Sequence, residues 1–335
     1  CDQYQGKFPV ISVSLKGAKA GNYEDAKAMM KYIMAAESRR LYDRMSGDKL
    51  SEKQKEQMKS LMSDNMKDTE LMTALWILSS ILKEYYGKKV IILIDEYDVP
   101  LDKAFENNYY NEMIILLLNM LEQSLKTNDN LYMAVLTGCL RIARESIFTG
   151  LNNFNIFSIT DQYFDEYFGF TDKEVKEILQ YYKVPEAFEQ TKKWYDGYRF
   201  GSADIYCPWD VLNHCKALKV EPDATPQPYW INTSGNYIVK RFIEKANQQT
   251  RREIEQLIEG KAIQKEIRLE LTYNELDSTI ENRWSVLFAT GYLTQQGKPQ
   301  GRTYSLIIPN ESIRQIFIEQ IQEWFKETTR KDENR

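Results

Sequence analysis

Apolar residues in the first half of the chain form short runs, and stretches with a helical period separate these runs. FPVISVSL (8–15) alternates and is rich in β-branched residues, whereas VIILI (90–94) and LYMAVLTG (131–138) are continuous. Such runs predict strands, the continuous ones buried in a parallel sheet. A further strand is expected at FNIFSIT (154–160). The order strand, helices, strand, helix, strand indicates an α/β fold.

Helices are predicted between these runs. Residues 23–87 have a helical pattern, and a second helix is expected from about Asn111 to Lys126. Thr171, with Glu174 three residues later, fits a capping box and predicts the start of a helix in a second domain. The clearest apolar face combines spacings of three and four: Leu71, Leu75, Leu78, Leu82 and Tyr85.

The last third of the chain follows another pattern. After the proline-rich EPDATPQP (221–228), helices are expected to resume to about Gly260. A helix through Trp284, a turn-rich segment (294–302), a strand (304–308) and a final amphipathic helix then resemble a winged-helix unit. We therefore expect three domains: an α/β core (1–165), a helical lid (166–260) and a winged-helix-like domain (261–335).

Composition narrows the range of partners. The 335 residues carry a net charge of −5, so no overall basic field attracts nucleic acid. A local basic face in the tail keeps nucleic acid as a weaker hypothesis: Lys261, Lys265, Arg268, Arg283 and Arg302. No apolar run is long enough for a transmembrane helix, and no signal peptide is recognisable, so we expect a cytoplasmic protein without a membrane partner.

Metal and thiol chemistry based on cysteine or histidine is not indicated. The four cysteines are far apart and form no CxxC pair, which argues against a zinc knuckle or a disulfide framework. The single histidine, His214, lies in an expected helix without obvious chemical partners. A structural role is therefore the better interpretation for it.

The acids at the end of the second strand are the main candidates for chemistry. Ligands bind at the carboxyl edge of parallel sheets, which is where Asp95 and Glu96 are expected to lie. Asp95 would hold Mg²⁺ through its water shell, and Glu96 would orient the attacking water. The competing interpretation is that both acids only solvate the strand end.

The next strand supplies further candidates. Thr137 at its tip would lie between the acids and the terminal phosphate of a nucleotide. Arg141 and Arg144 follow at helical spacing and could reach that phosphate, where a guanidinium stabilises developing charge. Surface ion pairs are the alternative for both arginines.

Four segments together resemble the bacterial AAA-ATPase-like family: IILIDEYDVPL (91–101), AVLTGCLRIARESIFTGLNNF (134–154), WYDGYRFG (194–201) and CPWDVLNH (207–214). The resemblance implies an ASCE-type, P-loop ATPase core that uses ATP and Mg²⁺. In that family the module is usually followed by a nuclease-like domain of the PD-(D/E)XK type, which is the partner the resemblance implies.

The resemblance also assigns roles to individual residues. Asp95 and Glu96 match the Walker B acids, Thr137 matches a sensor-1 position, and Arg141 lies in the TGCLRI stretch. Arg199, in the WYDGYRF box, matches a candidate second sensor, although a turn packed between domains is the better interpretation of that box.

One departure from the family is clear, because no G-x-x-x-x-G-K-[ST] loop occurs in the sequence. The sequence therefore predicts an ATPase core that is incomplete at its N-terminus, a fragment that is inactive alone and whose parent protein gates or powers a nuclease-like effector. The alternative is a non-enzymatic protein- or nucleic-acid-binding module with a degenerate ATPase fold. The choice between ATP and GTP, and the oligomeric state, stay open.

Overall fold

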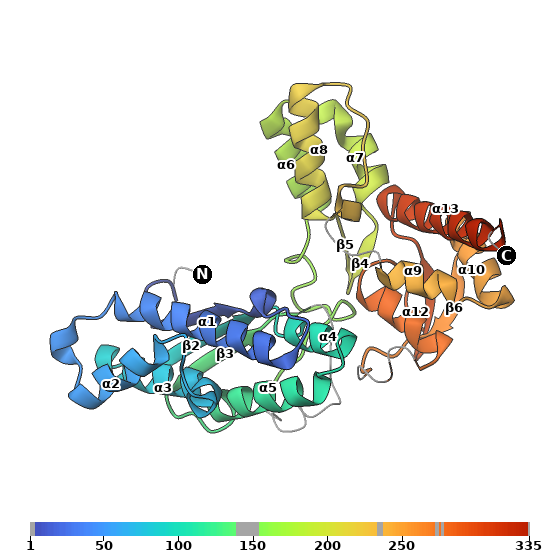
Figure 1. Ribbon diagram of the computed structural model, residues 1–335. Coiled ribbons are helices and arrows are strands. Elements are labelled where there is room, and N and C mark those ends of the chain that lie inside the picture. The colour runs from blue at the N-terminus through green and yellow to red at the C-terminus, as the bar shows by residue number, and fades with distance from the viewer. Residues whose placement is uncertain (1–3, 139–153, 233–236, 272–274, 276–277, 334–335) are drawn as a thin grey trace. The chain divides into compact units, whose positions relative to one another are not determined.

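The computed structural model describes residues 4–138, 154–232, 237–271, 275 and 278–333 (Figure 1). The chain divides into two compact units: unit 1 comprises residues 1–155 with 270–273, and unit 2 comprises 156–269 with 274–335. The division into three domains stays a prediction. No helix in the described part of the chain has both the length and the apolar character that crossing a bilayer requires.

Unit 1 is built on a parallel sheet of three strands. These are β1 (Val10–Ser14), β2 (Val90–Asp95) and β3 (Leu131–Leu136), in the order β1-β2-β3. The central strand β2 pairs in parallel with both neighbours. The α/β class and the parallel sheet predicted from the apolar runs are therefore confirmed.

Helices connect the strands as the sequence pattern predicts. Both crossovers step across the sheet in the same direction, and because such connections are right-handed, their helices are expected on one face. That face carries Ile11, Val13, Ile92 and Ile94, which are all buried. The helical segments of unit 1 are η1 (Leu15–Gly17), α1 (Tyr23–Tyr42), η2 (Gly47–Lys49), α2 (Glu52–Leu61), α3 (Asp68–Tyr86), α4 (Val99–Glu106) and α5 (Tyr110–Leu125).

The opposite face of the sheet is open. Leu93 in β2 is 36% exposed, and Met133 and Val135 in β3 are 45% and 42% exposed. The continuous apolar runs 90–94 and 131–138 predicted buried strands, and this prediction is wrong for Leu93, Met133 and Val135. The physical reason is the one-sided placement of the connecting helices, which leaves alternate residues of β2 and β3 uncovered.

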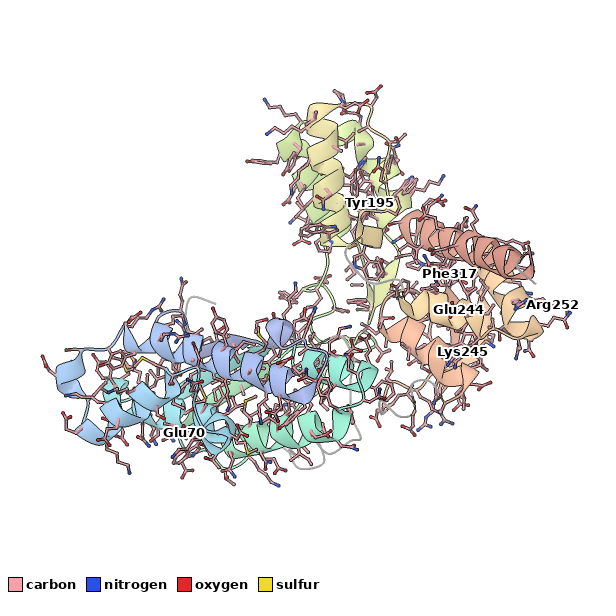
Figure 2. All side chains as sticks on the ribbon, viewed as in Figure 1. Glu70, Tyr195, Glu244, Lys245, Arg252 and Phe317 are labelled. Carbon is pink, nitrogen blue, oxygen red and sulfur yellow. The ribbon has the colours of Figure 1, made fainter. Side chains whose placement is uncertain are left out.

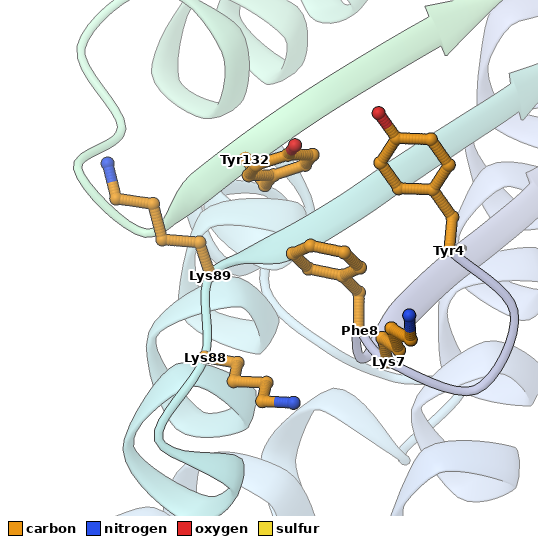
Figure 3. Close-up of a pocket in the computed structure, with 6 residues that line it drawn as sticks. All are labelled: Tyr4, Lys7, Phe8, Lys88, Lys89 and Tyr132. Carbon is orange, nitrogen blue, oxygen red and sulfur yellow. The ribbon is translucent and has the colours of Figure 1, made fainter.

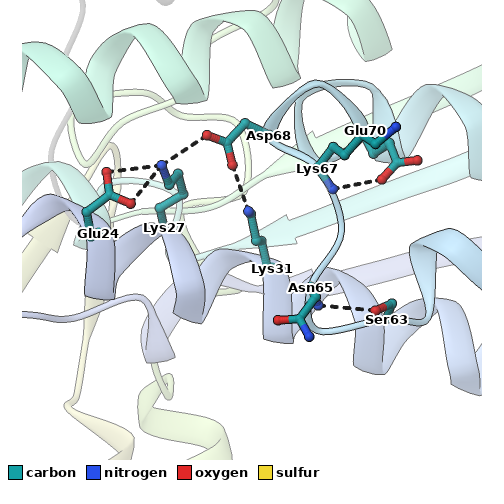
Figure 4. Close-up of polar contacts among 8 residues, drawn as sticks. All are labelled: Glu24, Lys27, Lys31, Ser63, Asn65, Lys67, Asp68 and Glu70. Atoms are coloured by element: carbon teal, nitrogen blue, oxygen red, sulfur yellow. Dashed lines mark hydrogen bonds and ion pairs between the residues drawn. The ribbon is translucent and has the colours of Figure 1, made fainter.

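An ion-pair network links the start of α1 to the start of α3 (Figure 4). Lys27 contacts both Glu24 and Asp68, and Lys31 lies 2.7 Å from the other oxygen of Asp68. Hydrogen bonds from Lys31 and Lys27 lower the pKa of the Asp68 carboxyl. The network ties together two helices that are separated in sequence by α2.

The strand predicted at 154–160 is not observed in its described residues. The backbone N–H and the hydroxyl of Ser158 instead donate to Asp161 Oδ2, at 2.7 and 2.9 Å. Such local side-chain bonds favour a turn over a sheet ladder, so the apolar content of FNIFSIT misled the prediction.

Unit 2 contains helices and two antiparallel sheets, β4-β5 and β6-β8-β7. The capping box is confirmed, because Thr171 and Glu174 exchange the expected bonds at the start of α6. The winged-helix assignment of the tail stays a prediction. The elements are α6 (Asp172–Tyr182), η3 (Pro185–Ala187), α7 (Phe188–Tyr195), β4 (Tyr198–Phe200), β5 (Ala203–Ile205), α8 (Pro208–Val220), η4 (Tyr229–Asn232), α9 (Tyr237–Glu244), α10 (Gln248–Ile258), β6 (Ile263–Glu266), α12 (Ile280–Ala289), β7 (Thr294–Gln295), β8 (Thr303–Ile307) and α13 (Glu311–Glu333).

The WYDGYRF box contributes to both hydrophobic clusters of unit 2. Tyr195 belongs to one cluster, and Tyr198 packs against the other, which contains Phe317; Tyr195 and Phe317 are labelled in Figure 2. Between the two tyrosines, Gly197 has φ +102°, and a Cβ there would lie 2.0 Å from the carbonyl oxygen of Pro309. Only glycine fits this close approach.

Two titratable groups are buried on α8. His214 lies within the expected helix, here α8, and is fully buried against the ring of Tyr195. Burial lowers the pKa of His214 to about 4 and raises the pKa of Asp210 to about 6. Burial therefore disfavours the charged form of both groups in the folded protein.

These shifts predict a pH-dependent stability. Between pH about 6.5 and about 4 the unfolded chain protonates His214 whereas the folded chain does not, so acidification destabilises the fold. As the pH falls from 7 to 4, the unfolding free energy of His214→Leu should rise by up to about 3 kcal/mol relative to that of the wild type. Urea denaturation at each pH measures this difference.

The pKa shift of Asp210 makes stability depend on pH in the opposite direction, so this residue provides the control. Its folded pKa lies above the unfolded value, so its contribution to stability falls as pH rises from about 4 to about 6. Asp210→Asn should therefore gain stability relative to the wild type as pH rises through this range. A stability difference between His214→Leu and the wild type that does not vary with pH would contradict the assignment.

Candidate functional site

The carboxyl edge of the unit 1 sheet brings three polar side chains together. Asp95 ends β2, Ser14 ends β1 and is paired with Asp95 in register, and Thr137 directly follows β3. Thr137 Oγ1 donates to Asp95 Oδ1 at 2.5 Å, and Ser14 Oγ donates to Asp95 Oδ2 at 3.4 Å. The exposed carboxylate of Asp95 therefore lies between hydroxyls from both neighbouring strands.

Backbone bonds extend the pairing of β2 and β3 past the ends of the two strands. The N–H of Thr137 donates to the carbonyl of Ile94 at 2.9 Å, and the N–H of Tyr97 donates to the carbonyl of Thr137 at 3.0 Å. These bonds fix Thr137 beside Asp95. The strand-tip argument from the sequence anticipated this proximity.

Glu96 has an unusual backbone conformation. Its φ is +56°, in the left-handed region, although it is not a glycine. Such conformations cost free energy for residues with a Cβ and cluster at functional sites. The turn lets β2 end at Asp95 and leaves Glu96 half-buried at the same edge.

Gly138 allows two side chains to pack under this edge. A Cβ on Gly138 would lie 2.6 Å from Asp98 Oδ1 and 2.7 Å from Tyr97 Cε1. Both of these side chains are buried, and Asp98 is the residue at the N-cap of α4. Sequence reasoning named neither Ser14 nor Gly138 as part of the site; the polar end of the first strand and the glycine after Thr137 were the available signals.

Two of the three predicted arginines lie outside the described residues, and the third belongs to unit 2. Arg141 and Arg144 lie outside the described residues. Arg199 belongs to unit 2, where its guanidinium pairs with Asp204 at 3.0 Å across the β4-β5 hairpin and its N–H donates to Thr294 Oγ1 at 2.8 Å. The roles proposed for these arginines stay predictions.

The oxygen donors around Asp95 suit a hard cation. Within the described residues no group of three or more His, Cys, Asp or Glu side chains is placed to hold a metal. Mg²⁺, however, keeps several waters and often uses only one or two carboxylates together with substrate phosphates. One exposed carboxylate flanked by two hydroxyls fits that requirement.

Three of the five cations on the basic face expected in the tail are paired with acids. Carboxylate oxygens of glutamates lie 2.6 to 3.9 Å from side-chain nitrogens of three of these cations, and the pair formed by Lys265 is mostly buried. Ion pairs of this kind leave little free charge for phosphates. The three pairs are Lys261–Glu259, Lys265–Glu253 and Arg268–Glu266.

The contact at Gly138 gives a stability prediction. Gly138→Ala should lower the unfolding free energy by about 1–3 kcal/mol, because the new methyl group collides with Asp98 and Tyr97. Gly21→Ala is the matched control, since nothing lies within 4 Å of a Cβ at that position. Equal stability of the two variants in urea denaturation would show that the close approach is not present in solution.

The similarity to known proteins covers the part of the chain that contains this site. A curated relative, described as an uncharacterized protein in the vnfD 5' region of Azotobacter chroococcum mcd 1, is 27% identical over 152 residues, which are 44% of this chain. The chain covers only 27% of that relative's length. No solved structure gives a significant match. Residues 2–148, which contain the whole parallel sheet and its acidic edge, match the sequence model of the family described as "Predicted AAA-ATPase".

Proposed function

We propose that unit 1 is the core of a nucleotide-hydrolysing ATPase module and that hydrolysis takes place at the carboxyl edge of its sheet. The observation that carries the proposal is the convergence of Ser14, Asp95 and Thr137, with Glu96 next to them in a left-handed turn. The match of residues 2–148 to the AAA-ATPase-like family supports the same assignment.

Each residue has a distinct task in this proposal. Asp95 would hold Mg²⁺ through the ion's water shell, and Mg²⁺ bound there would supply charge neutralisation for the nucleotide phosphates. The hydrogen bond from Thr137 fixes the rotamer of Asp95 and directs one carboxylate oxygen. Glu96 orients the attacking water and accepts its proton, and Arg141 and Arg144 contact the terminal phosphate.

The rest of the proposal concerns the parent protein. The 335 residues contain no G-x-x-x-x-G-K-[ST] motif, so we propose that sequence outside them supplies the phosphate cradle. Nucleotide state would then gate or power a nuclease-like effector, with Arg199 as the second sensor. The low coverage of the Azotobacter relative is compatible with a longer protein of this kind.

The test compares this chain with a version extended upstream, each titrated with MgATP and MgGTP by calorimetry. We expect binding by the extended protein only. In that protein Glu96→Gln should retain binding but lower kcat by about 10²- to 10⁴-fold, because the water loses its base. Asp95→Asn should weaken binding in the presence of Mg²⁺ more than in its absence.

Glu56→Gln, at an exposed position on α2, is the matched control and should leave both quantities unchanged. Hydrolysis that survives Glu96→Gln would remove Glu96 from the mechanism. If neither protein binds nucleotide, the ATPase proposal fails, and the fold would serve as a protein- or nucleic-acid-binding module without catalysis.

A further inference from the structure

The amino ends of the three parallel strands form a second site, at the opposite edge of the sheet from Asp95. A cavity of about 620 Å³ opens there (Figure 3), within the usual size range of ligand pockets. We call it the amino-end pocket. It is lined by Tyr4, Lys7, Phe8, Lys88, Lys89 and Tyr132.

Three aromatic rings form a ladder in the amino-end pocket. Phe8, just before β1, stacks on Tyr132 of β3 with ring centroids 4.4 Å apart and planes at 27°. Tyr4 continues the series at 6.3 Å from Phe8. Tyr4 and Tyr132 are each 48% exposed, so two of the three rings keep much of their surface accessible.

Three lysines line the same pocket as this ladder, and the side chain of Lys89 extends away from the rings (Figure 3). Lys88 and Lys89 precede β2, Lys7 precedes Phe8, and all three are exposed. Throughout the described part of the chain, no acidic side chain forms an ion pair with any of them. Their charge is therefore not neutralised, unlike that of the tail cations Lys261 and Lys265.

Parallel pairing explains why these groups meet. The N–H of Ile91 donates to the carbonyl of Pro9 at 3.0 Å, and the N–H of Val90 donates to the carbonyl of Asn130 at 2.8 Å. Residues that enter the three strands are thereby held side by side, although they are far apart in sequence. The arrangement is built by the backbone of the sheet and does not depend on contacts among the lysines.

We propose that the amino-end pocket binds single-stranded nucleic acid. Flat aromatic faces stack on unpaired bases, and unneutralised lysines around them contact the phosphates. In a duplex the faces of the bases are stacked on one another, so the aromatic rings of the pocket could not reach them. An anionic membrane would use the charge of the lysines without needing stacked rings, so the response to removal of a ring separates these two ligands.

This site is separate from the proposed ATPase site. Five residue steps of β2 separate the two edges, which corresponds to roughly 16 Å. The proposal stands on the rings and lysines alone, so it does not require nucleotide hydrolysis. Failure of the ATPase proposal would leave it intact.

The experiment measures fluorescence anisotropy of labelled dT15 and U15 with the full 335-residue chain, over a series of salt concentrations. We expect binding at low salt with a slope of log K against log salt of about −2, as for three phosphate contacts. The two oligonucleotides distinguish DNA from RNA as the natural source.

Variants separate charge from stacking. Lys88→Glu with Lys89→Glu should weaken binding by more than tenfold and reduce the slope to about −0.7. Tyr132→Ala should weaken binding about tenfold without changing the slope, and Tyr132→Phe should restore the affinity. Lys53→Glu with Lys59→Glu, on the exposed surface of α2, is the control with the same change of charge and should bind like the wild type.

Several outcomes would overturn the proposal. The proposal fails if the wild type binds neither oligonucleotide. It also fails if the α2 control weakens oligonucleotide binding as much as the Lys88→Glu with Lys89→Glu variant does. Binding of phosphatidylserine vesicles or heparin that equals oligonucleotide binding and is insensitive to Tyr132→Ala would indicate a surface that recognises charge alone.

Discussion

Parallel pairing of three strands is the constraint on which the rest of unit 1 depends. Because the strands run in the same direction, all of their carboxyl ends meet at one edge and all of their amino ends meet at the other. One edge collects Ser14, Asp95 and Thr137, and the other collects the rings and lysines of the amino-end pocket. A single backbone arrangement thus creates two chemically opposite surfaces, one acidic and one basic.

The sequence predicted the parts of this arrangement that depend on local pattern. Apolar runs located β1, β2 and β3, and the capping box at Thr171 located the start of α6. Both signals depend only on a few neighbouring residues in the sequence. The proximity of Thr137 to Asp95 followed from the shared strand edge. Arg141 and Arg144 were proposed from their helical spacing after the third strand and Arg199 from the resemblance, and their roles are still predictions.

The remaining features depend on tertiary contacts that no local pattern encodes. The role of Ser14 requires the register between β1 and β2, and the need for glycine at position 138 arises only when Asp98 and Tyr97 pack beneath it. The open face at Leu93 depends on the side of the sheet that the helices cover. The turn at Ser158 replaced a strand because two side-chain bonds compete with sheet pairing.

The connection between β1 and β2 has a kinetic consequence. These two strands are adjacent in the sheet, yet α1, α2 and α3 separate them in sequence. The entropy of closing such a long loop must be lost before the parallel ladder gives any stabilisation, whereas each helix forms from local contacts. The helices should therefore form early and the sheet late, and until it closes, the apolar residues of β2 remain exposed to association with other chains.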